Sequence, residues 1–420
     1  MGLCQSHRRA GTVVTPVVNA ADPTALRQYS LITLNYWAFT LTDGALRMLI
    51  VLYFYQLGYD ALAIAWLFLF YELFGVITNL VGGWLGARIG LNRTMNLGLL
   101  CQAIALGALL VPDAWLTLGW VMAAQALSGV AKDLNKMSAK AGLKSLLPAG
   151  QNQRLFRWVA ALTGSKNTLK GVGFFLGGFL LWSVGFWWAI ASLLMIILAA
   201  GCASILFLQS DLGKSRARAK FSQVFANSAP LNWLSLARLC LFAARDVWFV
   251  VALPISLASS YGWSHSQVGA FFALWIIGYG VVQGFTPQLL MNFSQPTDGR
   301  RAFWAALPLF AAMLLLFGLT LTLEISAAVL TLLLCLFGLF FAINSSIHSY
   351  LIVAWARSDG ASLDVGFYYM SNAMGRLIGT VLSGYLYVQY GLTACLLAST
   401  ALLAAVILIS LRLKQLPAAQ

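Results

Sequence analysis

The chain has 420 residues, of which 60% are hydrophobic and only 9% are charged. Soluble globular proteins contain about 25% charged residues, so this composition excludes an ordinary soluble enzyme as well as a disordered chain. The 26 Lys and Arg outnumber the 12 Asp and Glu and give a net charge of +14. A basic excess of this size fits a nucleic acid, a membrane surface or an anionic substrate as the partner. The positions of the basic residues along the chain distinguish these three.

The chain starts with a polar segment, residues 1–28, which we interpret as an N-terminal tail. It contains Arg8, Arg9 and Arg27 but no long apolar core, so it lacks the pattern of a cleaved signal peptide. The six cysteines lie far apart and form no C-x-x-C pair. We therefore expect them to be small buried residues, and we predict neither a metal site nor a cofactor.

Twelve apolar segments follow, each close to the roughly 20 residues that a helix needs to cross a bilayer. They are residues 30–57, 61–86, 94–111, 115–137, 156–182, 186–208, 231–259, 265–290, 303–323, 326–354, 363–388 and 391–413. The longest polar connection, 209–230, separates a first bundle (29–208) from a second (231–413), and 414–420 form a C-terminal tail. The sequence thus predicts an all-α membrane protein with twelve transmembrane helices in two six-helix, pseudo-symmetric halves.

The connections between the segments alternate in charge. One set is basic and includes the run KSRARAK at 214–220, whereas the other set has no Lys or Arg and contains Asp60, Asp113 and Glu324. Because cytoplasmic loops are enriched in Lys and Arg, both termini are expected on the cytoplasmic side. This orientation accounts for most of the basic excess, and a nucleic-acid partner is not expected.

The connection after the second segment carries a recognisable motif. Its sequence, GGWLGARIGLNR at 82–93, resembles the loop pattern G-x-L-x-D-R-x-G-R-[RK] of the major facilitator superfamily. Gly83, Arg88 and Gly90 match, Ala87 replaces the usual Asp, and Arg93 ends the stretch. The resemblance implies the fold of that superfamily, and the missing acid puts in doubt the charge latch that this loop usually forms.

Ionisable residues deep in the segments are candidates for function, because each costs about 2.5–3.5 kcal/mol at the centre of a bilayer. The basic ones outnumber the acidic ones, and a surplus of buried cations favours an oxyanion ligand. The predicted substrate-binding residues are Asn35, Arg47, Lys166, Lys170, Arg245, Tyr368, Asn372 and Arg376. Residues predicted to act in binding or gating are Lys132, Arg238, Asn344 and His348. Those predicted for proton coupling or ion pairing are Asp43, Glu72, Asp133 and Asp246.

Several of these residues also have a purely structural interpretation. Asp43 and Arg47 are i,i+4 neighbours that fit a structural ion pair. Glu72 fits a protonated packing residue, and His348 fits a buried histidine with its hydrogen bonds satisfied. Lys136 and Lys140 lie near the end of their segment, where long side chains extend to the membrane surface.

Stretches in both halves resemble the ArsJ family of bacterial organoarsenical efflux permeases. They include NYWAFTLTDGALRML (35–49), ALSGVAKDLNKMSAK (126–140), LTGSKNTLKGVGFFLGG (162–178) and LDVGFYYMSNAMGRLIGTVLSG (363–384). The resemblance implies export of 1-arseno-3-phosphoglycerate, which glyceraldehyde-3-phosphate dehydrogenase makes when arsenate replaces phosphate. It also implies a monomer in the bacterial inner membrane, with alternating access and possible proton coupling.

Two other functions are compatible with the residues. The first is an exporter or exchanger of phosphate or a phosphorylated metabolite, which needs the same cations. The second is a non-transporting receptor or scaffold, which has no use for buried cations and is disfavoured. No enzymatic activity is expected.

Overall fold

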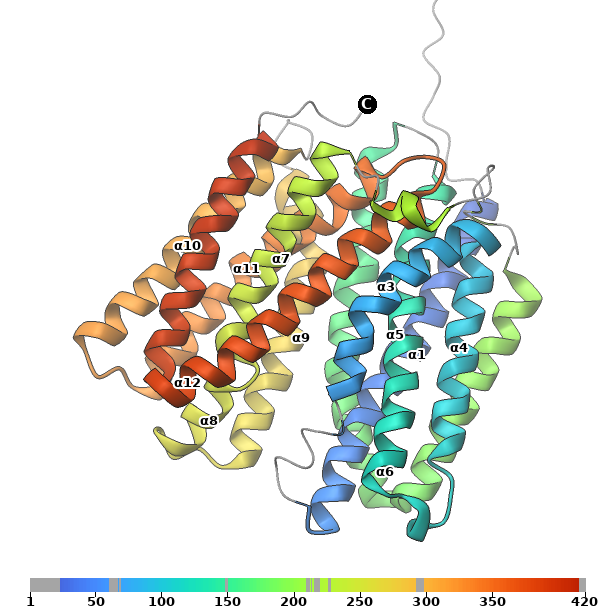
Figure 1. Ribbon diagram of the computed structural model, residues 1–420, viewed down its shortest axis with the longest axis horizontal. Helices are drawn as coiled ribbons and strands as arrows, with labels where there is room; N and C mark the ends of the chain where they lie inside the picture. The colour runs from blue at the N-terminus through green and yellow to red at the C-terminus, as the bar shows by residue number, and fades with distance from the viewer. Residues whose placement is uncertain are drawn as a thin grey trace, which may run out of the picture.

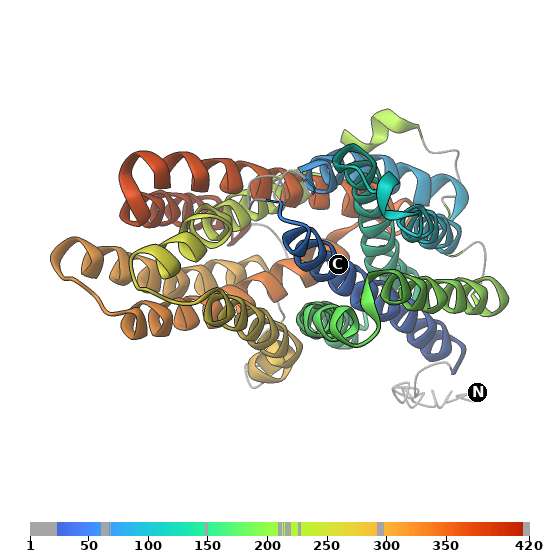
Figure 2. The same ribbon diagram turned by 90° about the horizontal axis from the view of Figure 1, so that it is seen from below.

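The computed structural model describes residues 23–59, 67, 69–147, 150–208, 212, 214, 220–225, 228–291 and 298–414. Their regular structure is entirely helical (Figure 1). The first half contains α1 (Pro23–Gln56), α3 (Leu69–Ile89), α4 (Leu91–Ala108), η1 (Asp113–Trp115), α5 (Leu118–Leu146) and α6 (Asn152–Phe207). After the short helix η2 (Phe221–Phe225), the second half contains α7 (Ala229–Phe249), α8 (Ala252–Ser259), α9 (His265–Met291), α10 (Gly299–Thr322), α11 (Ala327–Trp355) and α12 (Ala361–Lys414). The two halves lie side by side when viewed along the helices (Figure 2).

α6 and α12 are helical hairpins rather than single rods. Gly185 in α6 has φ 78° and Gly391 in α12 has φ 76°, which is a backbone region that glycine enters at little cost. Each helix turns back at that residue (Figure 1). The two limbs of α6 correspond to the predicted segments 156–182 and 186–208, and those of α12 to 363–388 and 391–413.

The predicted segment 231–259 is broken into α7 and α8. Pro254 has no N–H to donate to the carbonyl of residue 250, four positions earlier, and its ring crowds that carbonyl. Val251 accordingly leaves the helical conformation, with φ −120° and ψ −52°. The predicted span is recovered as Ala229–Ser259, and the proline inside the apolar run interrupts its helix.

Length and hydropathy identify seven described helices that can cross a membrane, and α6, α7 with α8, and α12 are among them. The predicted count of twelve is thus recovered only in part by this criterion. α4 is short and α5 carries several charges, while the apolar part of α3 is limited to Leu73–Ile89. α4 and α5 nevertheless pack with α6 in the first half, and α3 packs against α5 and against α12 of the second half.

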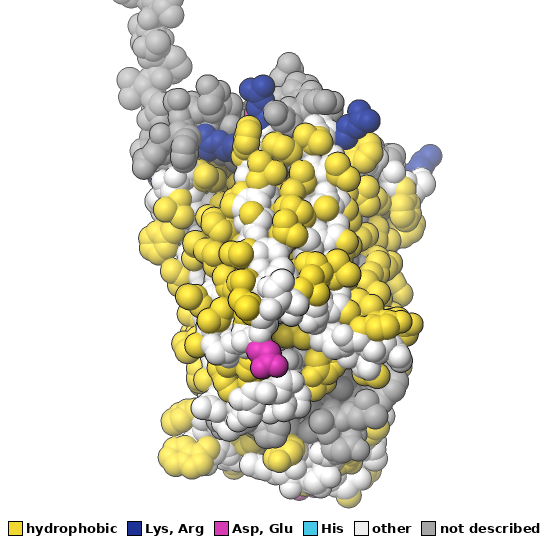
Figure 3. All heavy atoms as spheres, turned by 90° about the vertical axis from the view of Figure 1, so that its left-hand side faces the viewer, with side chains coloured by type: hydrophobic (Ala, Val, Ile, Leu, Met, Phe, Trp, Pro, Cys, Tyr) yellow, Lys and Arg dark blue, Asp and Glu magenta, His cyan; other side chains and the backbone are white. Residues whose placement is uncertain are grey.

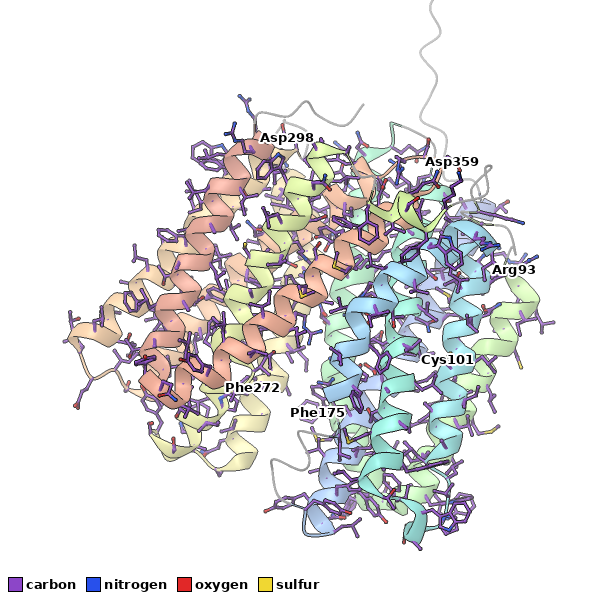
Figure 4. All side chains as sticks on the ribbon, in the orientation of Figure 1. Arg93, Cys101, Phe175, Phe272, Asp298 and Asp359 are labelled. Atoms are coloured by element: carbon purple, nitrogen blue, oxygen red, sulfur yellow. The ribbon has the colours of Figure 1, made fainter. Side chains whose placement is uncertain are left out.

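The two ends of the molecule differ in charge. The end at which α1 begins and α12 ends, here called the basic end, carries Arg93, together with Asp298 and Asp359 (Figure 4). Lys and Arg gather there, whereas a broad hydrophobic face covers the flank below (Figure 3). Exposed Trp182, Leu206 and Val388 are typical of helices that face lipid. The opposite, far end holds the glycine turns of α6 and α12.

The halves are in close contact near the basic end. A Cβ atom placed on Gly164 of α6 would lie 2.5 Å from the carbonyl oxygen of Gly280 in α9. One placed on Gly83 of α3 would lie 2.7 Å from the carbonyl oxygen of Ser362 in α12. Both distances are too short for a side chain, so glycine permits these two helix crossings.

An apolar patch surrounds the α3–α12 crossing. Ala87, which replaces the acid of the loop motif, is buried with Val224 of η2 and Leu363 of α12. Phe221 and Phe225 of η2 add edge-on ring contacts to Trp84 and Phe367. The contact between α3 and α12 is therefore apolar at the position of the usual carboxylate.

Candidate functional site

The deep charges of both halves come together between the two bundles. Lys170 of α6 interacts electrostatically with Arg47 of α1 and with Arg376 of α12, and Lys166 interacts with Arg376 and with Lys132 of α5. We call the following residues the central cation cluster: Arg47, Lys132, Lys136, Lys140, Lys166, Lys170, Arg238, Arg245 and Arg376. The described carboxylates among them are Asp43, Asp133 and Asp246. Cations thus outnumber carboxylates three to one in this part of the structure.

Asp246 of α7 organises the arginines of the second half. Its Oδ1 accepts a 2.6 Å hydrogen bond from Nε of Arg245, and its Oδ2 accepts a 3.2 Å hydrogen bond from Nε of Arg376. The carboxylate itself is fully buried. One acid therefore positions two guanidinium groups.

Arg238 lies two helical turns from Arg245 on α7, toward the basic end, and is held by neutral groups. Its Nε donates to Oδ1 of Asn372 at 2.9 Å, and its Nη1 donates to the hydroxyl of Ser345 at 2.9 Å. Only 3% of the residue is exposed. Among the described residues, no salt bridge compensates this buried guanidinium.

The network around Arg238 reaches the first half through Gln283 of α9. Nε2 of Gln283 donates to the hydroxyls of Tyr279 and Ser345, at 2.9 and 3.1 Å. Its Oε1 accepts a 2.5 Å hydrogen bond from Nδ2 of Asn167 on α6. Gln283, Tyr279 and Ser345 were not predicted, because neutral polar residues in apolar helices carry no charge signal.

In the first half, Tyr71 of α3 is the centre of the contacts. Its hydroxyl donates to Oδ1 of Asp43 at 2.6 Å, while the guanidinium of Arg47 lies 4.7 Å and Nζ of Lys132 lies 3.8 Å from the ring centroid. In the described part of the chain, no salt bridge joins Asp43 to Arg47. The i,i+4 ion-pair interpretation is therefore wrong, because Asp43 turns to the tyrosine hydroxyl.

Lys136 and Lys140 of α5 belong to the cluster, which corrects the expectation that they extend to the membrane surface. Lys136 forms a salt bridge with Asp133, and Nζ of both lysines lies 4.9 Å from the ring centroid of Tyr369. The sequence pattern misplaced them because α5 continues to Leu146, well past the predicted segment 115–137. The extra helical turns place Lys140 inside the protein.

The remaining predicted residues lie at the edges of the cluster or away from it. Asn344 donates to the carbonyl of Ala302 in α10, and His348 is completely buried, near enough to Arg238 to interact with its charge. The ring nitrogens of His348 have no hydrogen-bond partner among the described residues, so the interpretation of a satisfied histidine is wrong. The side chain of Glu72 lies outside the described residues.

The loop motif lies at the basic end, away from the cluster. Gly90 has φ 98° and precedes α4, and the guanidinium of Arg88 lies 5.1 Å from the ring centroid of Trp84. Gly83 makes the helix crossing described above. Arg93 follows in the first turn of α4.

Exposure falls steadily from the far end toward the basic end. On α12, 30% of the Arg376 side chain is exposed, compared with 7% of Asn372 and none of Tyr368. On α5, the Lys132 side chain is 15% exposed and Lys140 only 3%. The cluster residues compared on both helices are more exposed toward the far end, so the cluster is more accessible from the far end than from the basic end.

Comparisons with known proteins agree with this architecture. A sequence model of the Major Facilitator Superfamily matches residues 234–420, which is most of the second half. No curated protein sequence matches the chain at a significant level.

Solved structures with similar folds cover nearly the whole chain. The human organic anion transporter MFSD10 (TETRAN) has a TM-score of 0.74 at 17% identity, over 93% of this chain and 100% of that one. The Escherichia coli fucose:proton symporter FucP, in an outward conformation, has a TM-score of 0.74 at 12% identity, over 94% and 100%. A bacterial homologue of ferroportin in an outward-facing state has a TM-score of 0.73 at 14% identity, over 93% and 99%. The fold is the one seen in these transporter structures, and the family match covers most of the second half.

Proposed function

We propose that this chain, whose fold is that of the major facilitator superfamily, is a secondary transporter that exports a small oxyanion ester. The surplus of buried cations over carboxylates in the central cation cluster is the observation that carries the proposal. Unpaired positive charge is costly in a low dielectric unless an anion binds. Arginine forks suit tetrahedral oxyanions, and lysines add mobile charges beside them.

The direction of transport follows from the proposed orientation. With both termini in the cytoplasm, the basic end faces the cytoplasm and the far end faces outward. The described conformation then makes the cluster more accessible from the outside than from the cytoplasm. It represents the state from which an exported anion leaves.

The proposed substrate is 1-arseno-3-phosphoglycerate, through the resemblance of both halves to the ArsJ family. Its phosphate and arsenate-ester oxygens match the donors of Arg245, Arg376 and Lys170. During transport the ester would reach Arg245 and Arg376, where its oxygens compete with Asp246 for the guanidinium N–H groups. Rocking of the two halves about the glycine crossings would then change the side on which the cluster is open.

Loss of resistance tests the proposal. Arg376→Ala and Lys170→Ala should each abolish arsenate resistance in cells that also produce the dehydrogenase, with unchanged protein in the membrane. Arg300→Ala, which removes an exposed charge at the basic end, is the matched control and should leave resistance intact. Normal arsenate resistance in both cluster variants would contradict the assignment of the site.

A phosphorylated metabolite is the second candidate substrate, because phosphate and arsenate are both tetrahedral oxyanions and the cluster contains no group selective for arsenic. Inverted vesicles, which take up an exported substrate from the medium, separate the two when the dehydrogenase reaction mixture is supplied outside them. If 3-phosphoglycerate competes at equal concentration and is itself transported, the metabolite exporter is favoured.

Proton coupling is tested in the same vesicles with and without a pH gradient. Asp43, Asp133 and Asp246 are the described carboxylates that would carry the proton, since each contacts a cation or tyrosine of the cluster. Export that is independent of the gradient would exclude this form of coupling.

A further inference from the structure

Seven of the nine cations of the cluster fall into two levels along the helices; the other two, Lys132 and Lys136, form salt bridges with Asp133. Arg47, Lys170, Arg245 and Arg376 lie at an outer level, toward the far end, together with Asp43 and Asp246. Lys140, Lys166 and Arg238 lie at an inner level, toward the basic end. Arg238 and Arg245 are seven residues apart on α7, and at about 1.5 Å per residue this separates the levels by about 10 Å.

The charge balance of the two levels is different. Asp246 binds Arg245 and Arg376 of the outer level, and Asp43 also lies there. At the inner level, the described residues place no carboxylate within salt-bridge distance of Lys140, Lys166 or Arg238. The three cations are close enough for the charges of Arg238 and Lys166 to act on Lys140. Repulsion among these buried cations is therefore only partly offset, through the longer-range attraction of Asp43 for Lys166.

Unpartnered donors surround these inner cations. The hydroxyls of Tyr36 and Tyr368 and Nδ2 of Asn35 have no hydrogen-bond partner among the described residues, and all three residues are more than nine-tenths buried. Tyr369 connects the two tyrosines to Lys140, because it lies near Tyr36 and Tyr368 and its ring centroid lies 4.9 Å from Nζ of that lysine. Buried donors without acceptors are costly, and an oxyanion would supply acceptors to all of them.

We infer that the inner level is a second oxyanion subsite, centred on Lys140 and completed by Lys166, Arg238 and the hydroxyls of Tyr36 and Tyr368. It takes a tetrahedral group of the phosphate class and lies on the basic-end side of the Arg245–Arg376 pair. An anion entering from the basic end meets this level first. The inference rests on the proposed function for its physiological ligand, but the subsite itself is defined by its own residues.

Binding of inorganic phosphate to the purified full chain tests the subsite. Titration calorimetry should give a binding step whose Kd rises at least tenfold in Lys140→Met and stays within threefold of the wild-type value in Lys140→Arg. Lys144→Met is the matched control, since Lys144 lies one turn further along α5 and donates to the carbonyl of Ala354 instead. It should bind phosphate as the wild type does. Unchanged affinity in Lys140→Met, or no binding in the wild type, would overturn the inference.

Location and ligand source need separate measurements. In crystals grown with arsenate, the anomalous arsenic signal should lie between Lys140 and Arg238; a signal at Arg376 alone contradicts the subsite. Titration with 3-phosphoglycerate in the presence of phosphate identifies the source of the ligand. If the ester competes with phosphate, the subsite binds a transported ester. If it does not compete, the subsite binds free phosphate alone. If arsenate-dependent transport is absent while phosphate binding depends on Lys140, the proposed substrate fails and the subsite stands.

Discussion

The two halves share one architecture but supply different cations to the space between them. The first half contributes five lysines and one arginine to the central cation cluster, whereas the second contributes only Arg238, Arg245 and Arg376. The arginines are fixed by Asp246, Asn372 and Ser345, while the ammonium groups of Lys136 and Lys140 rest on the ring of Tyr369. A planar guanidinium with five donors needs to be oriented, whereas an ammonium on a flexible stem adapts to the ligand. The difference indicates a rigid recognition surface in the second half and an adjustable one in the first.

Asp246→Asn should disrupt the arginine contacts of the second half most strongly. The change removes the one charge that binds both Arg245 and Arg376, and losing one partner of a buried ion pair typically costs about 3–5 kcal/mol. Transport should fall on the order of 100-fold, since 1.4 kcal/mol corresponds to about tenfold. Vesicle transport normalised to protein amount measures it. Asp298→Asn, at the basic end, is the control and should retain activity.

Exchanging the two kinds of cation sharpens the contrast. Arg376→Lys keeps the charge but loses the fork, so transport should fall about tenfold. Lys170→Arg keeps the charge at an adjustable position, and transport should stay within about threefold. Initial rates of export compare the two. Equal losses of transport rate in both variants would contradict a rigid recognition surface in the second half and an adjustable one in the first.

Breaking the hydrogen bond between the halves should have a smaller effect. Gln283→Leu removes the partner of Asn167 and one partner of Ser345, which should slow transport about fivefold by loosening Arg238. Thr286→Ala is the matched control on the same helix, because that hydroxyl bonds only within α9. If the control slows transport equally, the effect belongs to α9 packing rather than to the network.

The smallest effect is expected at Tyr71. Tyr71→Phe keeps the ring beneath Arg47 and Lys132 but removes the hydrogen bond to Asp43, which is worth about 0.5–1.5 kcal/mol, or somewhat more for a charged acceptor. Transport should fall two- to fivefold, measured as the rate at saturating substrate. Tyr53→Phe, near the far end of α1, is a control that should behave as the wild type.

Charge and periodicity in the sequence predicted the helical segments and the deep cations. The features that were not predicted have physical explanations. The segments, the halves and the deep cations were predictable because charges in apolar helices are rare and costly. Lys140 was misplaced because helix length past the apolar run is not encoded in hydropathy. The break at Pro254 was missed because the surrounding residues remain apolar on both sides. Gln283 and Ser345 carry no net charge, so only the fold could reveal that they hold Arg238.

The apolar patch around Ala87 has a consequence for how the basic end responds to its surroundings. Glycine crossings and the side chains of Val224, Leu363 and Trp84 replace the usual carboxylate at this contact. Moderate ionic strength screens charge pairs but has little effect on apolar contacts, whereas cooling weakens the hydrophobic contribution. Temperature, rather than salt concentration, should therefore control how readily this end of the protein opens.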